Sequence, residues 1–140
     1  MSENGSAPFG RPIPPVTPDT EEWWNATREQ RLMVQTCGIC GHHQFYPRAI
    51  CTSCGSDEVS LTEASGEGRI YSVTIVQRSP DPENFPAPYA VALVRLEEGP
   101  MLLSNIVGMG ALTASCEASV TLAWEKLPDG RNLPIFQMTL

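Results

Sequence analysis

Two matched cysteine pairs constrain this chain more than any other feature. The sequence reads Cys37-Gly-Ile-Cys40-Gly and then, after a short interval, Cys51-Thr-Ser-Cys54-Gly. Each pair can present two thiolates on one tight turn, and the glycine that follows can take the positive φ that lets the chain fold back. Four sulfurs complete the tetrahedral shell of Zn²⁺ and leave no position for water or substrate. The spacing therefore predicts a structural zinc site, not a catalytic one.

Two other interpretations of these cysteines are a pair of disulfides and four reduced thiols. His42 and His43 stand beside the first pair and are alternative ligands in principle. Because four cysteines already fill the coordination shell, we expect both histidines to be solvated or packed on the ribbon surface. Cys116, the fifth cysteine, lies among small residues and is predicted to be a small buried hydrophobe.

Length and charge narrow the function classes. A chain of 140 residues accommodates one domain, or one domain with a small satellite. The net charge is -7, and Lys126 is the single lysine, which argues against a protein that binds phosphate backbones. There is no apolar run of membrane-spanning length, and the first residues lack a signal-peptide pattern. Together with the paired cysteines, this predicts a cytoplasmic protein.

The N-terminal third is predicted to hold a tail, a helix and a ribbon. Residues 1–19 are rich in proline and are expected to be disordered or extended along a partner. A helix is predicted over about 20–33, capped by Asp19 or Thr20. Trp23 and Trp24 point about 100° apart on a helix, so we expect one in the core and the other over the ribbon or against a partner. Residues 20–60 then form the helix and zinc ribbon, whose stability depends on the metal.

Residues 61–140 carry the pattern of a small β-barrel. Five strands are predicted, with period-two or continuous apolar patterns, at 69–76, 89–96, 101–107, 118–124 and 133–138. A proline-rich loop spans 79–88, and a short helix is expected near 111–114. Because proline lies in the last strand, we place that strand at an edge. The fold class is mainly β: an N-terminal helix, a rubredoxin-like zinc ribbon and a five-stranded OB-fold barrel.

The order of these elements resembles a known family that pairs a rubredoxin-like zinc ribbon with an OB-fold and was formerly a domain of unknown function. The resemblance covers roughly residues 20–140. The motifs that carry it are Trp23-Trp24, Arg31-Leu32, the two cysteine pairs, Pro47-Arg48, the run from Ser65 to Ser72, Ala87-Pro88-Tyr89 and Glu97-Glu98-Gly99. The approach to the fourth strand, around Cys116, departs from the family pattern.

What the resemblance implies is a role in acyl-CoA metabolism. Members of that family accompany thiolase-like enzymes, lipid-transfer-type aldolases of steroid side-chain degradation and enoyl-CoA hydratases. The leading hypothesis is therefore a non-catalytic accessory subunit of an acyl-CoA-processing complex, with a thiolase-like aldolase or acyltransferase as partner. The sequence agrees, since its only histidines are adjacent and stand beside the zinc pair, and general bases are scarce.

Two alternatives stay open at this point. One is an independent module that binds CoA or an acyl chain, for which Arg48 is the preferred phosphate contact over Arg69, Arg78 and Arg95. The other is single-stranded nucleic-acid binding by the barrel aromatics, which the acidic balance opposes. The candidate contacts for CoA or a partner are Trp23, Trp24, Phe45, Tyr46, Arg48 and Phe85.

Overall fold

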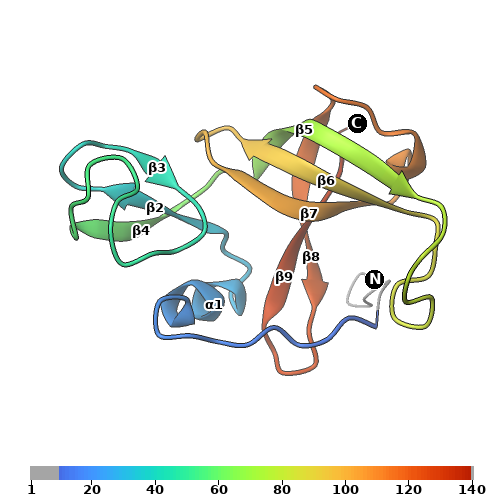
Figure 1. Cartoon of the computed structure of the whole chain (residues 1–140), viewed down its shortest axis with the longest axis horizontal. Coiled ribbons are helices and arrows are strands. Elements are labelled where there is room, and N and C mark those ends of the chain that lie inside the picture. Colours follow the sequence, from blue (N-terminus) through green and yellow to red (C-terminus); the bar gives the residue numbers. More distant parts are fainter. Residues whose placement is uncertain (1–9, 140) are drawn as a thin grey trace.

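The computed structural model describes residues 10–139. The small ribbon sheet has three strands, and Figure 1 shows it beside a larger barrel, with the short helix α1 below the ribbon. The elements are α1 (Glu21–Thr27), β2 (Met33–Cys37), β3 (His43–Gln44), β4 (Val59–Glu63), β5 (Glu67–Val76), β6 (Tyr89–Leu96), β7 (Met101–Val107), a 3₁₀ turn η1 (Ala111–Thr113), β8 (Ser119–Lys126) and β9 (Asn132–Met138). No helix in the described range has the length and apolar character needed to span a bilayer.

The ribbon is an antiparallel sheet with the order β3-β2-β4. Its central strand, β2, pairs along its whole length with β4, from Met33 opposite Glu63 to Cys37 opposite Val59. Only two residues of β3 pair with β2 on the other side. This sheet offers few apolar positions to a core, and the first cysteine stands at the end of its best-paired strand.

The helix is shorter than the sequence predicted. It ends at Thr27, whose hydroxyl donates to the Trp24 carbonyl at 2.6 Å. Gln30 then takes a φ of 56°, a left-handed conformation that stops helical propagation. The predicted range of 20–33 was therefore wrong at its C-terminal end, because Met33 belongs to β2 and pairs with Glu63 of β4.

Both tryptophans of the helix are buried, with Trp23 against Phe45 of the ribbon and Trp24 against Arg131 of the barrel hairpin, as the sequence predicted. Trp23 is 5% exposed and donates its indole N–H to the Met33 carbonyl at 2.8 Å. Trp24 is 9% exposed and meets Trp23 edge to face, with ring centroids 4.8 Å apart. The short helix therefore joins the ribbon to the barrel through two large side chains.

Five strands close the barrel in the order β5-β6-β7-β9-β8. All neighbours are antiparallel except β7 and β9, which run parallel. The long strand β5 closes the barrel by pairing with β6 along most of its length and with β8 over its first residues. Gly68 stands at this crossing, where a Cβ would come within 2.7 Å of the Arg95 carbonyl oxygen. The predicted OB-type barrel is confirmed.

The position of β9 corrects one expectation. This strand lies between β8 and β7 and is not an edge of the sheet. Proline is accommodated because β9 pairs with β7 only at Phe136 and Gln137, so Pro134 lies in the half that pairs with β8 alone. Closure thus tolerates a residue without an N–H where the ladder is one-sided.

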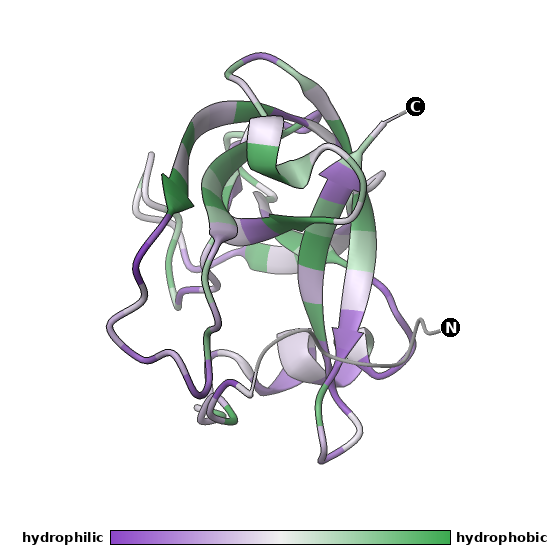
Figure 2. Ribbon diagram, turned by 90° about the vertical axis from the view of Figure 1, so that its right-hand side faces the viewer, coloured by the Kyte–Doolittle hydropathy of each residue, from purple (hydrophilic) through white to green (hydrophobic). Residues whose placement is uncertain are grey.

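The barrel interior is fully apolar at its centre. Ile70, Val94, Val120 and Phe136 are each 0% exposed, and they come from four different strands. Figure 2 shows hydrophobic and hydrophilic residues alternating along several barrel strands, as expected where one face lines a core. Burying a side chain of this size contributes about 1.5–3 kcal/mol, so the barrel has its own source of stability.

Residues 10–17, which we call the strap, run in extended form against the barrel. The structure therefore differs from the loose tail expected for residues 1–19, of which 1–9 lie outside the described residues. Arg11 makes two hydrogen bonds to the Glu125 carboxylate, at 2.8 and 2.9 Å, and a third to the Asn105 carbonyl oxygen at 2.9 Å. The Glu125 side chain is 0% exposed. A buried carboxylate thus fixes a segment whose composition alone would leave it unfolded.

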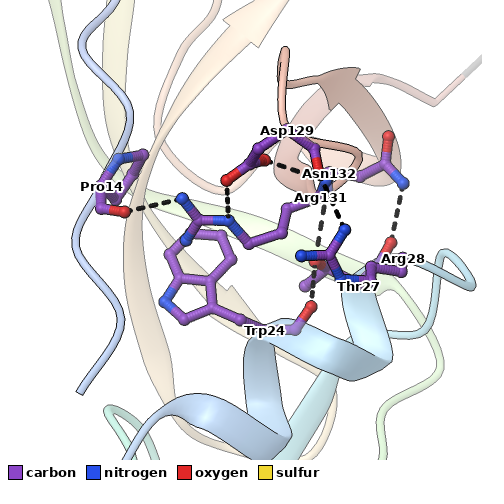
Figure 3. A network of polar contacts seen from close by, with 7 residues as sticks. All are labelled: Pro14, Trp24, Thr27, Arg28, Asp129, Arg131 and Asn132. Carbon is purple, nitrogen blue, oxygen red and sulfur yellow. Dashed lines mark hydrogen bonds and ion pairs between the residues drawn. The ribbon is translucent and has the colours of Figure 1, made fainter.

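A second anchor lies at the hairpin between β8 and β9, seen in Figure 3. The Arg131 guanidinium stacks over the Trp24 ring at 4.5 Å and donates to the Pro14 carbonyl at 2.7 Å. Its Nε also donates to Asp129 at 2.7 Å. One buried arginine therefore ties together the strap, the helix and the barrel.

Candidate metal centre and adjoining cleft

Each cysteine pair forms a tight turn, which we call a knuckle. In the first, the Gly41 N–H donates to the Cys37 carbonyl at 3.0 Å; in the second, the Gly55 N–H donates to the Cys51 carbonyl at 2.9 Å. The two glycines have φ values of 76° and 80°, which require a residue without a Cβ or a strained one. The repeated geometry explains why glycine follows the second cysteine of both pairs.

The four sulfur atoms converge on one point. All lie within 4.8 Å of one another. The Cys37 and Cys54 sulfurs are 3.6 Å apart, as are those of Cys40 and Cys51. A Zn–S bond of about 2.3 Å sets the tetrahedral S···S separation at roughly 3.8 Å. The donor set and its spacing fit Zn²⁺, and the four cysteines are positioned to bind it.

Backbone donors prepare part of this site for thiolate. The N–H groups of Cys40 and Ile39 approach the Cys37 sulfur at 3.5 and 3.4 Å. They lower the pKa of Cys37 to about 6, the Cys40 amide having the larger effect. The pKa of Cys51 is lowered in the same way, first by the Cys54 amide and then by the Ser53 amide. Half of the ligand set is therefore disposed to lose its protons readily.

Cys54 shows the opposite trend. The Ser56 amide favours its thiolate, but the Cys37 sulfur, burial and the other two cysteines outweigh that effect and raise the pKa of Cys54 to about 12. Four negative sulfurs at this spacing repel one another unless a cation lies between them. A divalent ion removes that repulsion, so metal binding and thiol deprotonation are linked.

A buried pair of glutamines positions the second knuckle, and the sequence analysis missed it. The Gln35 carbonyl oxygen accepts from the Gln44 amide and from the Arg48 N–H, both at 2.8 Å. The Gln44 carbonyl oxygen accepts from the Thr52 N–H at 2.8 Å. Gln35 is two residues before Cys37 and therefore lies on the same face of the strand. This spacing could have identified Gln35 from the sequence as a neighbour of the metal site. These amides hold the 45–52 segment against β2 and so aim Cys51 at the cluster.

The two histidines are exposed, in agreement with the expectation. His42 contacts the Thr52 hydroxyl at 3.2 Å and His43 contacts the Thr36 hydroxyl at 2.9 Å. Cys116 is also exposed, so its prediction as a buried hydrophobe was wrong. It lies in the turn before β8, next to Glu117, whose φ is 70°. This turn keeps the thiol outside the barrel.

A cleft of about 810 Å³ opens where the strap, the helix, the ribbon and the barrel meet. The strap and helix supply one wall and the ribbon loop another, while β6, β7, β9 and the 80–85 loop form the floor. Its lining is dominated by aromatic, proline and aliphatic side chains: Trp23, Trp24, Phe45, Tyr46, Phe85, Tyr89, Val91, Leu102, Leu103, Leu133 and Ile135, with prolines of the strap, the ribbon and the loop.

Five of the six contact residues suggested by the sequence line this cleft. Trp23, Trp24, Phe45, Tyr46 and Phe85 come from three separate segments and meet there. Arg48 is not among the lining residues: its side chain is exposed, while its backbone is held by Gln35. Of the other arginines considered, Arg69 donates to the Glu117 carbonyl and Arg95 stacks on Tyr71.

Comparison with known families accounts for both halves of the chain. Residues 24–60 match the family described as the rubredoxin-like zinc ribbon domain of ChsH2. Residues 61–125 match the family described as the C-terminal OB-fold domain of ChsH2. The boundary between the two matches falls within β4, the last strand of the ribbon, just before the barrel begins at β5.

Two curated relatives extend over most of the chain. A probable enoyl-CoA hydratase alpha subunit of Thermomonospora curvata is 35% identical over 127 residues, which are 91% of this chain but 40% of that protein. The chain thus spans well under half the length of that relative. A DUF35 domain-containing scaffold protein of Pyrococcus furiosus is 37% identical over 100 residues, 70% of this chain and 68% of that protein.

Solved structures give the same result. A chain of the Ltp2-ChsH2(DUF35) aldolase superposes with a TM-score of 0.82 at 33% identity, covering 91% of this chain and 100% of that chain. A DUF35 protein of unknown function from Sulfolobus solfataricus gives 0.66 at 18% identity, covering 89% of this chain and 87% of that one, which supports the fold alone.

Proposed function

This chain belongs to the DUF35 family of zinc-ribbon and OB-fold proteins, and we propose that it is a non-catalytic accessory subunit of an acyl-CoA-processing complex. Its partner in this proposal is a catalytic subunit of the thiolase-like class, an aldolase or acyltransferase, or alternatively a hydratase. The aldol cleavage, thiolysis or hydration itself is carried out on that subunit.

The observation that carries the proposal is the likeness to the chain in the Ltp2-ChsH2(DUF35) aldolase, which extends over nearly the whole of this protein. The relative named as a hydratase subunit points to the same class of substrates. The chemistry of this chain agrees, because Cys37, Cys40, Cys51 and Cys54 would fill the shell of a bound zinc ion. In this proposal the metal stiffens the ribbon and has no part in the reaction.

We place the complex in the cytoplasm. All five cysteines are free thiols in the structure, and four of them suit a metal that a reducing compartment keeps available. The ribbon and α1 form the rigid docking face in this account, and the 79–88 loop lies toward the partner's active site.

Co-purification tests the proposal. The full chain, tagged and expressed in its native host, is isolated and its companions are identified by mass spectrometry. We expect a stoichiometric acyl-CoA enzyme, whose turnover of acyl-CoA rises when this chain is added back. Cys40→Ser, which removes an exposed zinc ligand, is the matched variant and should lose the companion.

Two results would contradict the proposal. In the first, the chain elutes alone, zinc-loaded and monodisperse, and adding it to acyl-CoA enzymes from the same host changes no rate. In the second, the isolated chain turns over acyl-CoA by itself, which would make it an enzyme and not an accessory subunit.

A further inference from the structure

The cleft is chemically selective because its charged lining groups are already engaged within the protein. Arg11 and Asp81 are the charged residues among those that line it. Arg11 is bound to Glu125 and Asn105, and the Asp81 carboxylate accepts from the Asn84 side chain at 2.8 Å. A phosphate or carboxylate entering the cleft would have to compete with these contacts or lose its hydration without compensation.

The polar neutral groups of the floor are satisfied as well. The Asn105 amide donates to the Ala90 carbonyl at 2.9 Å, and the Ser104 hydroxyl donates to the Pro134 carbonyl at 2.9 Å. An apolar cavity without free hydrogen-bond partners holds water poorly. The floor therefore favours a hydrocarbon surface over water and over a charged ligand.

At the mouth of the cleft, the hydroxyl group of Tyr46 can act as a hydrogen-bond donor to a ligand. Tyr46 is 50% exposed, and its oxygen accepts from the Leu103 N–H at 3.3 Å. Among the described residues, no acceptor takes the phenolic proton. Leu103 beside it is 59% exposed. A neutral carbonyl at the rim, attached to an apolar group inside, would use both features.

The strap gives the cleft a preformed wall. Two buried residues, Glu125 at 1% exposed and Arg131 at 2%, hold this short segment in place through hydrogen bonds. Without the strap, the Glu125 carboxylate would be left unpaired in an apolar setting, which is costly. The wall is therefore fixed before any ligand arrives, which reduces the ordering cost of binding.

We infer that this cleft is a binding site for the apolar part of a neutral acyl thioester, with the thioester carbonyl at Tyr46 and any CoA nucleotide left outside. This inference rests on the proposed function for the identity of the thioester. The hydrocarbon preference itself follows from the lining alone, and the absence of a free charge separates the acyl group from its nucleotide carrier.

Binding to the zinc-loaded full chain tests the site with defined probes. Diphenylhexatriene, a hydrocarbon without polar atoms, should bind and gain fluorescence. Pantetheine thioesters of octanoic and decanoic acid should displace it and quench Trp23 and Trp24, with affinity rising by up to about fourfold per methylene. Free CoA should not displace the dye.

Three variants locate the ligand. Leu103→Trp places bulk at the mouth and should weaken both ligands at least about tenfold, on the scale of lost apolar burial. Leu112→Trp is the control, because Leu112 is 48% exposed on η1 and does not line the cleft. Tyr46→Phe should weaken the thioester by about fivefold through one lost hydrogen bond, and leave the hydrocarbon dye unaffected.

Several results would overturn the inference. These are no binding of the dye, equal losses in both tryptophan variants, or displacement by free CoA as effective as by the thioesters. Loss of the catalytic companion in Leu103→Trp without any ligand binding would make the cleft a docking groove for a protein segment. If the chain binds the ligands but has no catalytic companion, the inference about the cleft would be supported and the proposed function contradicted.

Discussion

The ribbon and the barrel both consist of short antiparallel strands joined by turns, but the two regions are stabilised in different ways. The barrel has a centre of side chains with no exposure, of which Phe136 is the largest. The ribbon places two of its best-buried side chains, Cys37 at 3% and Cys51 at 1%, at a metal site. Besides these, β2 buries Met33 and Val34, and the Gln35–Gln44 pair adds a polar contact within the ribbon.

This difference assigns a separate source of stability to each half. A sheet of three short strands has too little apolar surface to offset the entropy of folding. The metal supplies what the ribbon lacks, whereas the barrel gains its stability from burial. The two halves should therefore respond to different perturbations.

Removing a zinc ligand should have the largest effect and confine it to the ribbon. Cys40→Ser leaves three sulfurs, and zinc sites of this kind contribute on the order of 10–16 kcal/mol of binding free energy. We expect loss of bound zinc and an unfolded ribbon, with the barrel strands retained in circular dichroism. A variant that keeps one zinc per chain and normal ribbon amide shifts would show that three sulfurs suffice.

Removing the centre of the barrel should have the next largest effect. Phe136→Ala deletes a fully buried ring and should lower the free energy of unfolding of the barrel by about 3–5 kcal/mol. Denaturant unfolding measures that change, and the charge-transfer absorption of Co²⁺ bound to the cysteines reports on the ribbon. If cobalt binding fell together with barrel stability, the two halves would form one cooperative unit.

The glutamine pair should give a smaller effect on the ribbon. Gln44→Ala removes the acceptor of the Thr52 N–H and the donor to Gln35. Groups that orient metal ligands typically affect affinity by about 10–100-fold, and we expect a loss in that range by competition with a chelator. His43→Ala, at an exposed neighbouring position, is the control. Equal affinities for the two variants would remove the positioning role of Gln44.

The smallest expected effect is on the acid dependence of the melting temperature, through the carboxylate of Asp129. Asp129 is held by the Arg131 backbone and side chain and by Arg28, which together outweigh its partial desolvation and lower its pKa below 3.8. A carboxylate with a lower pKa in the folded state contributes stability above its unfolded pKa and loses it as pH falls through the folded one. The melting temperature should fall less steeply below about pH 4 in Asp129→Asn than in the unmodified chain. Identical acid slopes would contradict this.

Strand and motif patterns predicted most of this fold. The second and third barrel strands, 89–96 and 101–107, have the predicted bounds, because nearly continuous apolar runs and flanking turn residues define them locally. The four cysteines converge as their spacing indicated. The helix was overestimated since nothing local showed that Met33 would pair with β4.

Other features depend on contacts between distant residues. The strap is ordered by Glu125, more than a hundred positions away, so the composition of the segment could not reveal it. The cleft likewise brings Trp23, Tyr46 and Phe85 together from three elements. The sequence suggested these side chains as contacts, but their common site appears only in the packed structure.

Hydrogen exchange with and without a chelator tests the central claim most directly. The amides of Cys37 and Cys51 donate within the ribbon, and that of Leu96 donates within the barrel. After zinc removal from the unmodified chain, we predict that the ribbon amides lose protection while the Leu96 amide keeps it. Protection that persists in both halves, or is lost in both, would contradict the account in which metal stabilises the ribbon and apolar burial stabilises the barrel.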